Sequence, residues 1–60
     1  MNTYTVTFQI LDEEKQQIEV QAKTAEEATL SAMETINDEL VDIYDPIPAI
    51  QIDSVELVAP

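Results

Sequence analysis

The chain has 60 residues, of which 13 are Asp or Glu and two are Lys, and its net charge is −11. It contains no Cys, no His and no Gly, which excludes disulfides, zinc sites built on Cys or His, and Gly-rich phosphate loops. Catalysis by paired carboxylates needs a desolvated cleft, and one helix on three strands offers none. The sequence therefore predicts a single domain over 1–60 that is not an enzyme and has no catalytic residues and no cofactor.

The first half of the chain predicts a β-hairpin. The stretch YTVTFQIL alternates apolar and polar residues, which predicts a strand over 3–11, and QIEVQA predicts a second strand over 16–23. The polar segment DEEK between them lacks Gly, so we expect a connection of several residues and not a tight two-residue turn. The expected inward-facing residues of the two strands are Tyr4, Val6, Phe8, Ile10, Ile18, Val20 and Ala22.

A helix is predicted over 25–40. Thr24 and Glu27 form a capping box, in which the Thr24 hydroxyl accepts from the Glu27 amide and the Glu27 carboxylate reaches back to the Thr24 amide. Apolar residues recur every three or four positions, which defines a core-facing side. These residues are Ala25, Ala28, Ala32, Met33, Ile36 and Leu40.

The last third of the chain predicts an extended loop over 41–49 and a strand over 50–58. Pro46 and Pro48 cannot continue the helix and favour extended neighbours. The apolar alternation of the last strand changes phase between Ile52 and Val55, and a β-bulge near Asp53 and Ser54 would bring Ile50, Ile52, Val55 and Leu57 to one face. The predicted fold is α+β, a ββαβ domain whose three-stranded antiparallel sheet has the order 3-1-2, with the helix on one face.

The charge decides which partners fit. Nucleic acid and anionic membranes would repel the chain, so we expect no direct nucleic-acid or membrane binding and a basic protein as partner. No signal-peptide pattern and no long apolar run is present, so a cytoplasmic protein is expected. Four nearby acids lack the spacing of a calcium loop, so no metal site is predicted. They are Asp38, Glu39, Asp42 and Asp45.

The acids around the helix form the candidate binding site. On a helical wheel Glu27, Glu34 and Asp38 form a ridge opposite the core face, about 16 Å long at 1.5 Å per residue. Tyr44 would serve as an anchor within the acidic contact, although it could equally close the open end of the small core. The predicted partner-binding residues are Glu27, Glu34, Asp38, Glu39, Asp42, Tyr44 and Asp45.

Two functional hypotheses follow. Solubility of a small domain needs a net charge of magnitude about 2 to 8, and the magnitude of 11 found here is larger. The excess favours a protein that occupies a basic nucleic-acid-binding surface. In size, acidity and lack of catalytic residues the chain resembles the small acidic inhibitors of phages and mobile elements, of the anti-restriction or anti-CRISPR type. That resemblance implies the blocking of a nuclease complex in a bacterial host cytoplasm. The alternative is an assembly module that forms a homodimer through its sheet, with the acidity serving solubility.

Overall fold

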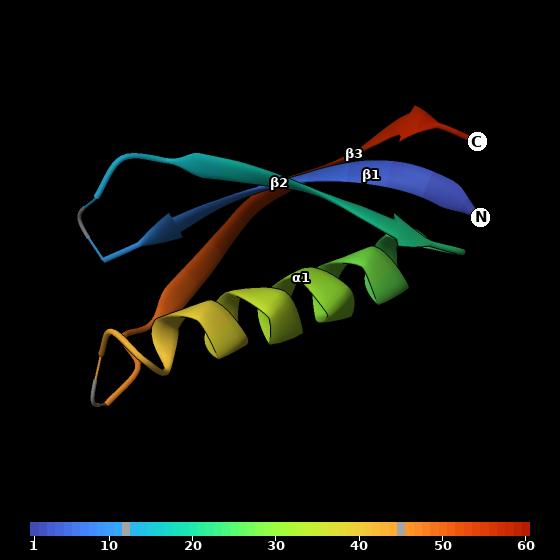
Figure 1. Ribbon diagram of the computed structural model, residues 1–60. Coiled ribbons are helices and arrows are strands. Elements are labelled where there is room, and N and C mark those ends of the chain that lie inside the picture. Colours follow the sequence, from blue (N-terminus) through green and yellow to red (C-terminus); the bar gives the residue numbers. More distant parts are fainter. Residues whose placement is uncertain (12, 45) are drawn as a thin grey trace.

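The computed structural model describes every residue except Asp12 and Asp45 and shows two layers, a sheet and one helix (Figure 1). The elements follow the order β1 (Asn2–Ile10), β2 (Gln16–Ala22), α1 (Ala25–Leu40) and β3 (Ile50–Ala59). Both β2 and β3 pair antiparallel with β1, so the fold is α+β with ββαβ order. Within the described residues, no helix is long and apolar enough to cross a membrane.

The strand order corrects the expectation from the sequence. The sheet runs β2-β1-β3, not 3-1-2 as expected. The short hairpin fixes β2 at one edge of β1, and the connection through α1 carries β3 to the opposite edge. β1 is the middle strand in both orders. The two orders differ in which edge strand is named first.

The core lies between the helix and one face of the sheet. The alternation predicted for β1 is confirmed, because its four inward residues are all buried, and Ala22 of β2 is buried as well. The helix contributes a stripe of buried residues at four-residue spacing. Two other residues that were expected on the core-facing side are less buried, since Met33 is half-buried and Ala25 is exposed. Ala at two of the four buried helix positions lets the helix approach the sheet closely. The buried helix residues are Ala28, Ala32, Ile36 and Leu40.

The last strand carries the expected irregularity and one unexpected exposure. Its register against β1 shifts between Ser54, opposite Thr7, and Ile52, opposite Phe8, which confirms the bulge predicted near Asp53. Leu57 lies opposite the inward-facing Tyr4, on the face predicted for it, but it is 59% exposed and adds little to the core. The reason is that β3 is an edge strand whose C-terminal end runs away from α1 (Figure 1).

The connection between β1 and β2 contains strained backbone. The Glu13 amide donates to the Ile10 carbonyl at 3.0 Å, which closes a turn just after β1. Leu11 in this turn has a φ of 54°. The left-handed region costs a residue with a Cβ about 1–2 kcal/mol, and Gly, which avoids that cost, is absent from the chain.

Candidate functional site

The helix starts with a cap that also uses one of the predicted site residues. Thr24 is extended, and its Oγ1 accepts from the Glu27 amide at 3.2 Å, as the sequence predicted. The Glu27 carboxylate, however, accepts from the Lys23 amide at 3.2 Å, one residue before the amide that the capping box predicted. Glu27 therefore has a structural role in the helix cap while its side chain remains exposed.

The acidic ridge, which we define as Glu27, Glu34 and Asp38, lies on the solvent side of α1. All three are exposed, and the helix buries its opposite stripe against the sheet. Glu39 does not belong to this ridge, because it lies a further 100° around the helix and borders a cavity instead. The predicted set is thus divided between two sides of the helix. Asp45 lies outside the described residues.

The C-terminal end of α1 explains how Tyr44 reaches the core. The Val41 amide donates to the Asn37 carbonyl at 3.0 Å, and the Tyr44 amide donates to the Leu40 carbonyl at 2.8 Å. The chain therefore continues to wrap around the helix end, and Tyr44 packs half-buried against the core. Asp42, within the same wrap, stays exposed, and the last turn of the helix has no basic residue.

A cavity of about 220 Å³ opens where this helix end faces the β1–β2 connection. We call it the end cavity. Apolar side chains from β1 and α1 line part of it, and polar side chains from the hairpin and the helix line the rest. Its residues come from two stretches of the chain that are distant in sequence, 8–16 and 36–44. They are Phe8, Ile10, Glu13, Gln16, Ile36, Glu39, Leu40, Ile43 and Tyr44.

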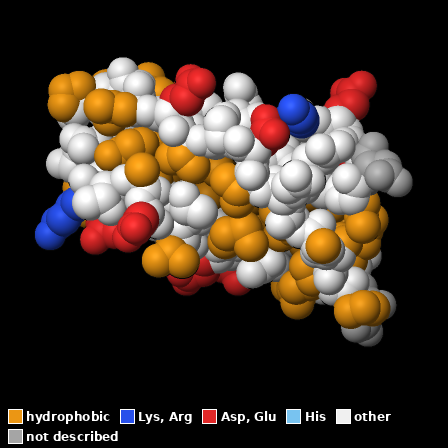
Figure 2. Space-filling model, turned by 180° about the vertical axis from the view of Figure 1, so that it is seen from behind, with side chains coloured by type: hydrophobic (Ala, Val, Ile, Leu, Met, Phe, Trp, Pro, Cys, Tyr) orange, Lys and Arg blue, Asp and Glu red, His pale blue; other side chains and the backbone are white. Residues whose placement is uncertain are grey.

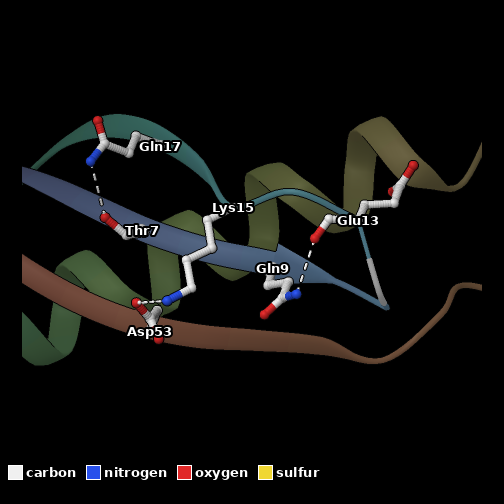
Figure 3. Close-up of polar contacts among 6 residues, drawn as sticks. All are labelled: Thr7, Gln9, Glu13, Lys15, Gln17 and Asp53. Atoms are coloured by element: carbon white, nitrogen blue, oxygen red, sulfur yellow. Dashed lines mark hydrogen bonds and ion pairs between the residues drawn. The ribbon is translucent and has the colours of Figure 1, made fainter.

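The two lysines do not neutralise these acids. Lys15 Nζ lies 3.1 Å from Asp53 Oδ2 on the polar face of the sheet, while the Glu13 carboxylate points away from this pair (Figure 3). Lys23 precedes the helix, so it lies at the end of α1 remote from Asp38. On the same polar face, Gln17 Nε2 donates to Thr7 Oγ1 at 3.3 Å (Figure 3).

The sequence reasoning missed the end cavity and the part that Glu13 and Gln16 play in it. Glu13 is close in sequence to Lys15 but far from Glu39, and only the fold brings Glu13 and Glu39 to one cavity. The predicted hairpin was the one signal in the sequence for this cavity. When a helix packs across an antiparallel pair of strands, the connection between the strands lies near one end of the helix. Among the described residues, no group of three or more acids could hold a metal ion.

Comparison with known proteins found no family model, no curated protein and no solved structure that matches this chain. The function therefore has to be argued from the chemistry of the acidic ridge and the end cavity.

Proposed function

We propose that the protein binds a basic protein surface through one side and one end of α1, and that it acts by occupying that surface. The observation that carries this proposal is the exposed acidic ridge, which forms no ion pair within the part of the chain that the structure describes. Glu34 and Asp38 are one helical turn apart, a like-charge pair that costs the helix a few tenths of a kcal/mol. Asp38 and Asp42 also lie at the negative end of the helix dipole. A small domain retains such unfavourable charges most readily where they meet a basic partner.

A nucleic-acid-binding surface is the partner that this geometry fits best. The ridge holds three carboxylates along about 16 Å, whereas one DNA strand carries about five phosphates over that length at 3.4 Å each. The ridge has the sign and linear form of a phosphate track but a lower charge density. Affinity must therefore also come from contacts other than charge, which the helix end can supply.

In this proposal the protein is an inhibitor that takes the place of nucleic acid on a nuclease or another nucleic-acid-processing complex. It needs no catalytic group for that role, because stoichiometric binding suffices. The proposed setting is a bacterial cytoplasm, where such complexes meet phage-encoded proteins.

The experiment compares two variants of equal charge. Asp38→Lys with Asp42→Lys reverses two acids of the proposed contact, and Glu19→Lys with Glu56→Lys reverses two acids that flank Thr5 on the opposite face of the sheet. Each substitution adds two units of charge, so both variants change the net charge from −11 to −7.

The native protein and both variants are used to capture proteins from a bacterial lysate. We expect the native protein and the Glu19/Glu56 variant to retain a basic nucleic-acid-binding protein that added duplex DNA displaces. The Asp38/Asp42 variant should lose it. Equal capture by both variants, or a captured protein that DNA does not displace, would contradict the proposal.

Self-association is the second candidate, and an observation on β3 favours it. This edge strand is ten residues long, and Leu57 and Val58 near its C-terminal end are 59% and 56% exposed. Figure 2 views the molecule from behind and shows hydrophobic side chains in a band across this face. An exposed strand edge with apolar side chains can pair with a second copy. Sedimentation across a range of concentrations tests this candidate: a tight dimer supports it, and a monomer at all concentrations contradicts it.

A further inference from the structure

The end cavity has both apolar and acidic residues in its lining. Part of the lining is apolar, from Phe8, Ile36 and Leu40, and two acidic residues, Glu13 and Glu39, also line it. A ligand that satisfies both needs an apolar stem and a cationic head. The volume of about 220 Å³ is below the roughly 300–1,000 Å³ of pockets that enclose a small-molecule ligand, so one side chain is the right size of occupant.

We propose that the end cavity binds the side chain of an arginine that a basic partner presents. The methylene stem would cover the apolar lining, and the guanidinium would lie between Glu13 and Glu39. Arginine fits this arrangement better than lysine, because its planar guanidinium can donate to two carboxylates and stack on the ring of Tyr44. The hydrogen bond from the Tyr44 amide to the Leu40 carbonyl holds the backbone of Tyr44 at the helix end, and the side chain packs against the core cluster beside the cavity.

Charge complementarity determines the occupant. Glu13 lies in the β1–β2 connection and Glu39 lies in α1. Neither forms an ion pair among the described residues, in which Lys15 pairs with Asp53. Lys15, the cation nearest in sequence, is directed to the polar face of the sheet instead (Figure 3). A cationic side chain in the end cavity would therefore meet two carboxylates that no lysine of the chain competes for.

This inference rests on the proposed function, because the basic partner supplies the arginine. The bound arginine would also supply a contact other than charge attraction, which the three carboxylates of the acidic ridge do not provide. An arginine in the end cavity would anchor the partner at the helix end, and the ridge would align the rest of its basic surface along α1.

The test is a titration of the ¹⁵N-labelled protein with acetyl-Gly-Arg-Gly-amide, followed by NMR. We expect saturable shifts of the amides of Glu13, Glu39 and Tyr44. The citrulline counterpart of the peptide, which has the same shape without the charge, should bind at least about tenfold more weakly, because it loses the hydrogen bonds between a charged guanidinium and the carboxylates. The lysine counterpart should bind more weakly than the arginine peptide.

Paired variants locate the binding. Glu13→Gln with Glu39→Gln should weaken the arginine peptide about tenfold or more, whereas Glu19→Gln with Glu56→Gln removes the same charge on the far sheet face and should leave its affinity unchanged. Circular dichroism checks that both variants fold. Absence of saturable shifts, equal binding of the citrulline peptide, or equal loss in both variants would overturn the inference.

The peptide titration and the lysate experiment fail separately. Saturable binding of the arginine peptide without a DNA-displaceable partner would uphold the end cavity and refute the proposed function. Capture of such a partner without any peptide binding would uphold the proposed function and overturn the assignment of the cavity.

Discussion

The acids at the C-terminal end of α1 should destabilise the fold, and Asp38→Lys measures by how much. In the native chain Asp38 lies in the last turn and one turn after Glu34, with no basic residue in that turn. The substitution removes a like-charge pair worth about 0.2–0.5 kcal/mol and creates an attractive Glu–Lys pair of similar size. It also replaces an anion by a cation at the negative end of the dipole, worth about 0.3–1 kcal/mol. We expect the free energy of unfolding to rise by about 1–2 kcal/mol.

The assay is urea unfolding followed by circular dichroism, because guanidinium chloride would screen the charges under test. With a slope near 1 kcal/mol per molar urea, typical of the smallest domains, the midpoint should rise by about 1–2 M at low salt. High salt should reduce the gain, since all the groups involved are exposed.

The matched control is Glu26→Lys in the first turn of the same helix. It makes the same change of charge at the positive end of the dipole, so it should lower stability by a few tenths of a kcal/mol to about 1 kcal/mol. If both substitutions raise stability equally, relief of the overall negative charge is the cause, and the reasoning from the helix end is refuted.

Two further predictions follow from the backbone and the core. Leu11→Gly should raise the free energy of unfolding by about 0.5–1 kcal/mol, because relief of the positive φ exceeds the added entropy of the unfolded chain; a lowered urea midpoint would contradict the strain. Ile36→Ala should cost about 2–5 kcal/mol, most of what a 60-residue domain possesses, since Ile36 is 2% exposed. The control Ile43→Ala should change stability by less than about 0.5 kcal/mol, since Ile43 is 71% exposed, and a similar loss of thermal midpoint in both variants would contradict the assignment of the core.

Local patterns were sufficient to predict much of the core. The alternation of Tyr4, Val6, Phe8 and Ile10 identified the buried face of β1, because side chains of a strand point alternately to opposite sides. The phase change after Ile52 located the bulge for the same reason. Which edge of β1 receives β3 depends on how the connection through α1 crosses the sheet, and local periodicity does not encode that crossing.

The sequence by itself determined the periodic elements and the helix cap at Thr24, because each depends on residues close together in the chain, and it determined the excess of negative charge, because that follows from composition alone. Only the tertiary structure decided which acids share a surface. It left Leu57 exposed on an edge strand and brought Glu13, Glu39 and Tyr44 to the end cavity. These outcomes depend on contacts between segments distant in sequence, and such contacts are fixed by packing of the helix on the sheet rather than by any local pattern.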